Sequence, residues 1–87
     1  MEIDETTVVD TESIVSEDAR NTLMSICEDL KERGYHPEKQ IVAYLISGDP
    51  GYISNYKECR NRITKYKKED LLEIMLVNFI NKWFIWD

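Results

Sequence analysis

Apolar residues recur at intervals of three and four along four stretches of the chain, a spacing that predicts α-helices with one buried face. We expect these helices at residues 17–33, 37–47, 54–66 and 68–83. The first carries its apolar positions at Ala19, Leu23, Ile26, Cys27 and Leu30. The pattern therefore predicts an all-α fold, a compact bundle of about four helices.

Two of the predicted helices have more apolar surface than a single face. Residues 41–46, IVAYLI, are apolar on nearly all sides, which predicts a central position for the second helix. The fourth helix carries the apolar residues Leu71, Leu72, Ile74, Met75, Leu76, Val77, Phe79 and Ile80. A domain this small cannot bury them all, so we expect helices two and four to build the core and much of a homodimer interface.

The stretch SGDPG, residues 47–51, separates the second and third predicted helices. It lacks the lysine of a phosphate-binding loop, the third glycine and preceding strand of a dinucleotide loop, and the repeated acidic ligands of a calcium loop. Gly48 suits a left-handed helix exit, Asp49 can accept backbone N–H bonds, and Pro50 fixes the turn. We interpret these three residues as a rigid structural corner.

The first fifteen residues differ in composition from the rest of the chain. They include Glu2, Asp4, Glu5, Asp10 and Glu12, with no lysine or arginine, no glycine or proline, and no helical stripe. We predict a disordered acidic arm over residues 1–15 and a helical dimerisation domain over residues 16–87. Within the arm, Thr6 and Thr7 are exposed candidates for phosphorylation, and each phosphate would add about −1.5 to −2 charges.

Residues with catalytic or metal-binding chemistry are few. His36 is the only histidine, and it precedes Pro37 where we expect a hydrogen-bonding role at the start of a helix. Cys27 and Cys59 have no CxxC or similar spacing and are expected to be buried free thiols. With no paired motif for catalysis, we predict a protein that is not an enzyme and uses no metal and no cofactor.

A basic stretch crosses the third predicted helix, with Lys57, Arg60, Arg62 and Lys65 set against the single acid Glu58. Three interpretations stay open: a solvated face that balances the acidic arm, a contact for phosphate or phosphopeptide, and a helix–turn–helix reader of nucleic acid. The net charge of −6 and the pI near 4.7 argue against nucleic acid. We therefore keep a small nucleic-acid-binding regulator only as the alternative function.

The tyrosines next to this stretch, Tyr52 and Tyr56, join it as candidate partner-binding residues. The N-terminus lacks the basic and apolar regions of a signal peptide, and no apolar run is long enough to span a bilayer. We therefore expect a cytoplasmic protein without a membrane partner.

The central part of the chain resembles the IreB family of small regulatory phosphoproteins of Gram-positive bacteria. The resemblance covers roughly residues 23 to 80 and lies in the pattern GY-P--QIV-Y--SGDP-YI. Its matching positions are Gly34, Tyr35, Pro37, Gln40, Ile41, Val42, Tyr44, Ser47, Gly48, Asp49, Pro50, Tyr52, Arg60, Ile63 and Lys65.

The resemblance implies a small helical homodimer without enzymatic activity. It also implies phosphorylation by a transmembrane Ser/Thr protein kinase with extracellular cell-wall-sensing repeats, and a role in the response to cell-wall stress. The family's modified threonines lie in a T-D-E-T-V motif, which matches residues 3–7 here. Thr6 aligns with the second threonine, Ile3 replaces the first, and Thr7 is additional, so we expect phosphorylation at Thr6, Thr7 or both. The sequence does not identify the protein partner that would distinguish the phosphorylated form from the unphosphorylated one.

Overall fold

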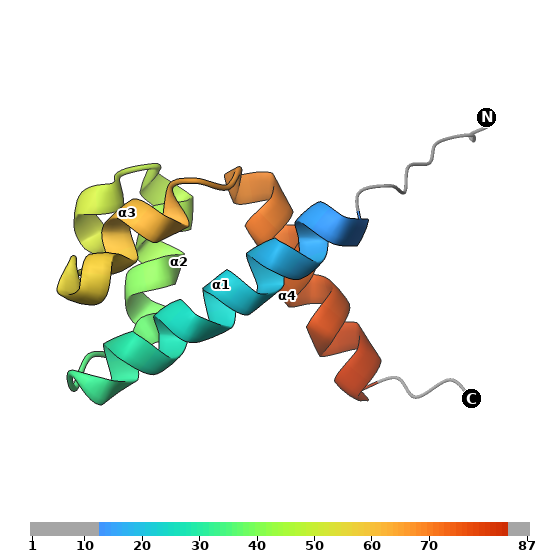
Figure 1. Cartoon of the computed structure of the whole chain (residues 1–87), viewed down its shortest axis with the longest axis horizontal. Helices are drawn as coiled ribbons and strands as arrows, with labels where there is room; N and C mark the ends of the chain where they lie inside the picture. Colours follow the sequence, from blue (N-terminus) through green and yellow to red (C-terminus); the bar gives the residue numbers. More distant parts are fainter. Residues whose placement is uncertain (1–12, 84–87) are drawn as a thin grey trace.

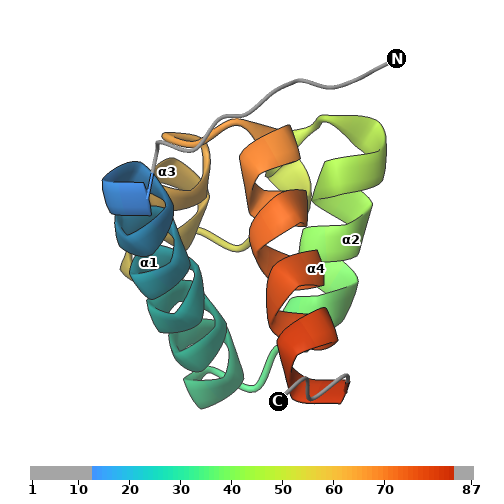
Figure 2. The same cartoon turned by 90° about the vertical axis from the view of Figure 1, so that its right-hand side faces the viewer.

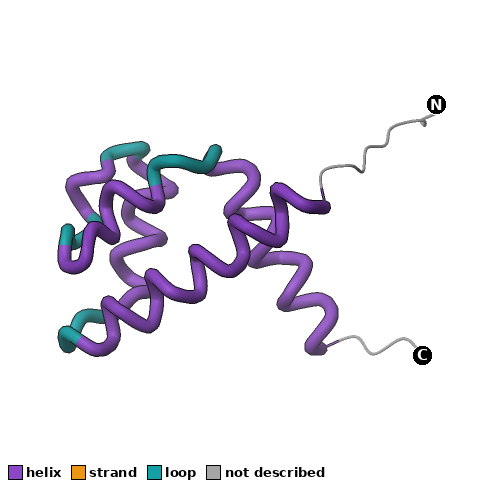
Figure 3. The backbone as a smooth tube through the Cα atoms, viewed as in Figure 1, coloured by secondary structure: helices purple, strands orange, loops and turns teal. Residues whose placement is uncertain are grey.

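The computed structural model describes residues 13–83, so Thr6, Thr7 and most of the expected arm lie outside the described residues. Residues 13–83 contain four α-helices: α1 (Ser13–Glu32), α2 (Pro37–Ser47), α3 (Cys59–Ile63) and α4 (Lys68–Trp83). Two short 3-10 turns, η2 (Pro50–Tyr52) and η3 (Tyr56–Glu58), connect α2 to α3. The described part of the chain contains no strand, which confirms the all-α prediction (Figure 3).

Helix α1 runs across the whole molecule, with α2 and α3 against its C-terminal half and α4 crossing its N-terminal half (Figures 1 and 2). It begins four residues before the predicted start, because no glycine or proline interrupts residues 13–16. It ends in a Schellman motif around Gly34, which takes a φ of 95°. In that motif the N–H groups of Gly34 and Tyr35 donate to Lys31 and Leu30 at 2.9 Å.

Helix α1 supplies the centre of the hydrophobic core. The buried residues are Ala19, Leu23, Ile26 and Leu30 from α1, with Ile41, Tyr44, Ile53, Cys59, Ile63, Leu71 and Ile74 packed around them. The buried face predicted for the first helix is therefore confirmed, with Cys27 only partly covered. The central position predicted for the second helix is wrong, because Val42 and Ile46 of α2 are 51% and 81% exposed.

The third predicted helix, residues 54–66, is also wrong as a single element. Ile53 and Cys59 are both fully buried, and the chain turns between them through η3. The Ser54 hydroxyl accepts a hydrogen bond from the Tyr56 N–H at 3.1 Å, an alternative to helical hydrogen bonding. Lys57 and Glu58 then adopt φ values of 53° and 64°, which interrupt a right-handed helix and delay α3 to Cys59.

This turn provides a test of backbone strain at Glu58. A left-handed conformation costs a non-glycine residue about 1–2 kcal/mol, whereas glycine adopts it freely. We expect Glu58→Gly to be more stable than Glu58→Ala by about 1 kcal/mol in urea unfolding. Alanine is the matched control, since both variants lose the carboxylate that accepts from Asn61. Equal stability of the two variants would contradict a strained backbone at this position.

The linker between α3 and α4 is attached to the beginning of α1. The Tyr66 hydroxyl donates a hydrogen bond to the Asp18 carboxylate and shares a 3.2 Å hydrogen bond with the Thr22 hydroxyl. The hydrogen bond to Asp18 raises the pKa of Tyr66, because it favours the protonated phenol. These contacts hold the start of α4 beside the first turns of α1.

Candidate functional site

The corner at residues 48–50 is built from local hydrogen bonds. Gly48 ends α2 with a φ of 78° and donates to the Tyr44 carbonyl at 2.7 Å. The Ser47 hydroxyl accepts from the Asp49 N–H at 3.0 Å, and the Asp49 carboxylate accepts from the Gly51 N–H at 2.8 Å. Pro50 begins η2. These groups satisfy one another, so the geometry is that of a turn between two elements.

The tyrosines predicted to contact a partner lie in different environments. Tyr52, in η2, is 54% exposed. Tyr56 is half-buried, and its ring faces two cations: the Arg33 guanidinium carbon is 5.9 Å and the Lys57 ammonium 5.5 Å from the ring centre. Cations over an aromatic face are attracted by its quadrupole. Tyr56 therefore helps to fasten the η3 turn to the end of α1.

Two side chains of the basic stretch, Lys57 and Arg62, form ion pairs with α1. The Lys57 ammonium lies 3.0 Å from Glu32 and 3.9 Å from Asp29. The Arg62 Nη2 atom donates to the Asp29 carboxylate at 2.6 Å, and Nη1 donates to the Ser25 hydroxyl at 3.1 Å. Burial lowers the pKa of Arg62, but the hydrogen bonds and charge interactions with Asp29 and Cys59 together outweigh burial, and the pKa is raised. Arg62 is therefore a charged anchor between α3 and α1.

Arg60 and Lys65 do not join Lys57 and Arg62 in one continuous basic surface. The Arg60 Nε atom donates to the Ile53 carbonyl at 2.9 Å and so braces the segment before η3. Lys65 is exposed in the linker that follows α3. Among the described residues, neither side chain lies within ion-pair distance of a carboxylate. A continuous solvated basic face, one interpretation of the sequence, is wrong for Arg62 because that side chain is only 26% exposed.

The histidine and the cysteines have structural surroundings. The hydrogen-bonding role expected of His36 at the start of α2 is carried by its backbone carbonyl, which accepts from the Lys39 and Gln40 N–H groups, while its side chain makes no cap hydrogen bond. Cys59 is fully buried and Cys27 half-buried, and both are free thiols. Burial raises the pKa of both thiols, which disfavours a reactive thiolate. Within residues described by the structure, no three His, Cys, Asp or Glu side chains gather as metal ligands.

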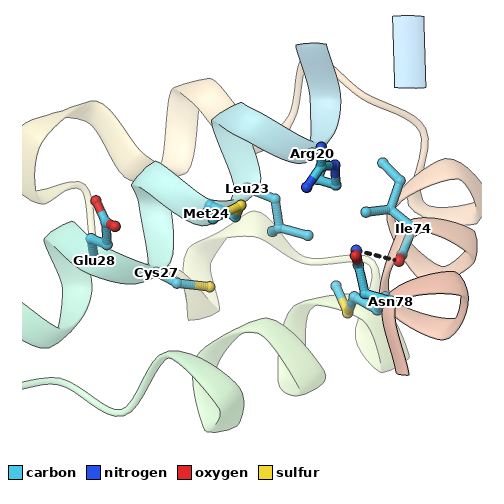
Figure 4. A pocket seen from close by; sticks show the side chains of 8 residues that line it. Arg20, Leu23, Met24, Cys27, Glu28, Ile74 and Asn78 are labelled. Atoms are coloured by element: carbon cyan, nitrogen blue, oxygen red, sulfur yellow. Dashed lines mark hydrogen bonds between the residues drawn. The ribbon is translucent and has the colours of Figure 1, made fainter. Parts of the chain in front are cut away.

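The most distinct surface feature is apolar rather than charged. Helix α4 buries Leu71 and Ile74, while the following large residues stay about half-exposed: Leu72, Leu76, Val77, Phe79 and Trp83. Beside them a groove of about 600 Å³ opens between α1 and α4 (Figure 4). Its lining is Arg20, Leu23, Met24, Cys27, Glu28, Ile74, Met75 and Asn78. The apolar excess of α4 was visible in the sequence, whereas the groove was not.

The sequence of this chain matches a known protein family. The sequence model described as IreB regulatory phosphoprotein matches residues 4–81, most of the chain. The chain belongs to the IreB family. A UPF0297 protein of Ruminiclostridium cellulolyticum is 40% identical over 76 residues, 87% of this chain and 86% of the relative. A UPF0297 protein of Acetivibrio thermocellus is 42% identical over 76 residues, 87% of this chain and 84% of the relative.

Membership in the IreB family confirms the resemblance seen in the sequence and indicates a regulatory role. The family is described as a regulatory phosphoprotein, which is not an enzyme class. The matched residues begin at position 4 and so include Thr6 and Thr7. None of the described helices has the length and apolar character needed to cross a membrane.

Proposed function

We propose that this IreB-family chain is a non-enzymatic regulatory phosphoprotein whose arm is phosphorylated at Thr6, Thr7 or both by a Ser/Thr protein kinase. The observation that carries the proposal is the family match, which covers the threonine pair together with the folded domain. The setting we propose is the cytoplasm, in signalling that responds to cell-wall stress. The folded domain presents surfaces for protein contacts, and the arm carries the signal.

The charge distribution gives a physical basis for such a signal. Residues 1–12 contain five of the seventeen acidic residues and none of the eleven basic residues. The remaining 75 residues therefore hold twelve acidic and eleven basic residues and are close to neutral. A phosphate on Thr6 or Thr7 adds about −1.5 to −2 charges to the part that is already negative. A protein partner with a basic surface would bind the phosphorylated arm more tightly, and an acidic one would bind it less tightly.

We further propose that the protein is a homodimer and has a second, unrelated protein partner. The half-exposed apolar residues of α4 support the homodimer, because large exposed apolar patches on small proteins mark interaction surfaces. The exposed Tyr52 and Lys65 are candidates for contacts with the second partner. No observation favours the alternative of nucleic-acid binding, since Lys57 and Arg62 are engaged with α1.

The experiment that tests the phosphorylation proposal is intact-mass analysis of the protein from its native host, before and after phosphatase treatment. We expect phosphatase to remove about 80 Da, the mass of one phosphate group, or twice that amount. Peptide mapping should place the modification on the segment that holds Thr6 and Thr7. Thr6→Val and Thr7→Val, separately and together, then show which hydroxyl is used. An unmodified protein in both resting and cell-wall-stressed cells would contradict the proposal.

A further inference from the structure

Arg60 differs from the other arginine of α3 in how its guanidinium is held. It is half-buried as the second residue of α3, and its Nε atom donates to the Ile53 carbonyl at 2.9 Å. The same peptide group is fixed at its other edge, because the Ser54 N–H donates to the Gln40 side chain of α2 at 2.9 Å. The side chain of Arg60 is therefore bonded to a peptide group that a second helix holds in place.

The outer edge of this guanidinium is open to solvent. An arginine has further N–H donors on its two Nη atoms, which the bond to Ile53 leaves unused. Within residues 13–83, these Nη atoms of Arg60 have no hydrogen-bond or ion-pair partner. The buried side-chain polar atom without a partner in that part of the chain is Arg62 Nε, so the Nη atoms of Arg60 reach the surface. Arg60 thus presents paired donors from a side chain that is already oriented.

An aromatic ring stands next to this edge in the chain. Tyr52 directly precedes Ile53 and is 54% exposed. The Tyr52 N–H donates to the Asp49 carbonyl at 3.2 Å, and the Ile53 N–H donates to the Pro50 carbonyl at 2.9 Å. The side chain of Ile53 is fully buried, so Tyr52 stands on a turn that is anchored in the core. Tyrosine and arginine are enriched among the residues that dominate protein interfaces.

We propose that Arg60 and Tyr52 form a binding site for one anionic group, a carboxylate or a phosphate, on the second protein partner. The site rests on the partner proposed above and names the chemistry by which that partner is recognised. The paired Nη donors match two oxygens of either group, and such charge-assisted pairs are stronger than neutral hydrogen bonds. The ring of Tyr52 supplies apolar surface for the carbon chain that carries the anion.

The charges around the site favour a single anion over a chain of phosphates. Asp49 lies on the same corner and Glu58 in the following turn, and their carboxylates accept hydrogen bonds within the fold. Both keep a negative charge that repels further anions near Arg60. Lys57 and Arg62 do not offset this repulsion, because they are paired with carboxylates of α1. A protein segment with one acidic or phosphorylated side chain therefore suits the site better than nucleic acid.

The test titrates the isotope-labelled full chain with sodium benzoate, sodium acetate and phenyl phosphate. Nuclear magnetic resonance follows the Nε–H signal of Arg60 and the amides of residues 52–54, and sodium chloride at equal ionic strength corrects for screening. We expect saturable shifts with a dissociation constant of roughly 1–10 mM for benzoate, as suits a ligand of this size. Benzoate should bind more tightly than acetate, because its ring contacts Tyr52.

Three variants, with folding checked by circular dichroism, assign the binding to this site. Arg60→Gln keeps a donor for the Ile53 carbonyl but loses the paired donors, so it should weaken benzoate at least about tenfold. Tyr52→Ala should remove the preference for benzoate over acetate. Lys65→Gln is the matched control: it removes the same charge from an exposed side chain of the next linker, and it should change the constant by less than about twofold.

Each outcome bears on the site. Shifts no larger than those with sodium chloride overturn it, and so does equal weakening by Arg60→Gln and Lys65→Gln, which would show a response to overall charge. Tighter binding of phenyl phosphate than of benzoate supports a phosphorylated partner residue, and the reverse supports a carboxylate. Binding of an oligonucleotide that Arg60→Gln abolishes would assign the site to nucleic acid and overturn the protein partner. Failure of the site leaves phosphorylation of Thr6 and Thr7 standing, since the mass measurement tests it separately.

Discussion

Replacing Ile26 with alanine is expected to lower the free energy of unfolding by about 3–4 kcal/mol. Ile26 is fully buried in the middle of α1, the helix that the other three helices pack against. The substitution removes apolar contact and leaves a cavity that α1 cannot close without moving away from its neighbours. Natural domains are stable by about 5–15 kcal/mol, so this single change should remove a large part of the total.

The measurement is urea unfolding followed by circular dichroism at one fixed protein concentration, because association of two copies would add to the apparent stability. Ile26→Val is the graded variant and should lose about 0.5–1.5 kcal/mol. Ile46→Ala is the control, since its side chain is 81% exposed and has little to lose. Similar losses for Ile26→Ala and Ile46→Ala would show that α1 is not the centre of the core.

The second large effect is expected at Arg62, where alanine should lower the free energy of unfolding by about 2–3 kcal/mol. Arg62 and Asp29 are 26% and 20% exposed, and their charged atoms meet at 2.6 Å. Removal of the guanidinium leaves the Asp29 carboxylate, which is 20% exposed, with only the more distant Lys57 ammonium at 3.9 Å, and loss of the nearer partner costs more than the ion pair itself contributes. The Ser25 hydroxyl also loses its hydrogen bond.

A double-mutant cycle separates the pair from its parts. Asp29→Ala combined with Arg62→Ala should cost less than the sum of the single changes, because neither charge is left alone. Lys57→Ala is the matched control: it also removes a cation that faces Asp29, but from an exposed position where ion pairs contribute little. Additive losses in the cycle would mean that Arg62 and Asp29 do not act as a pair.

The helical fold was predictable because its strongest signals are local. Pro37 and Gly48 bound α2 as predicted, since a proline tolerates the first turn and a glycine the left-handed exit. The prediction of the third helix was wrong because the start of this helix depends on contacts with residues that are distant in sequence. Burial of Ile53 and Cys59 against the core requires the turn at Lys57 and Glu58. Lysine and glutamate have no local preference for positive φ, so the sequence gives no sign of this turn.

The candidate site was less predictable because its parts come from distant positions. The sequence predicts Arg62 to be a surface cation. In the structure Arg62 pairs with Asp29, which is 33 residues away in sequence, and so anchors α3 to α1. The groove likewise forms only where Met24 and Cys27 of α1 meet Ile74 and Met75 of α4. The surplus of apolar residues on α4 was predictable from the sequence alone, because it exceeds what one helix face can bury.

The hydrogen bonds of Tyr66 to Asp18 and Thr22 have a consequence for how the fold opens. They connect the N-terminal half of α1 with the linker before α4, across 48 and 44 positions of sequence, so local opening of this part of α1 would also release the linker.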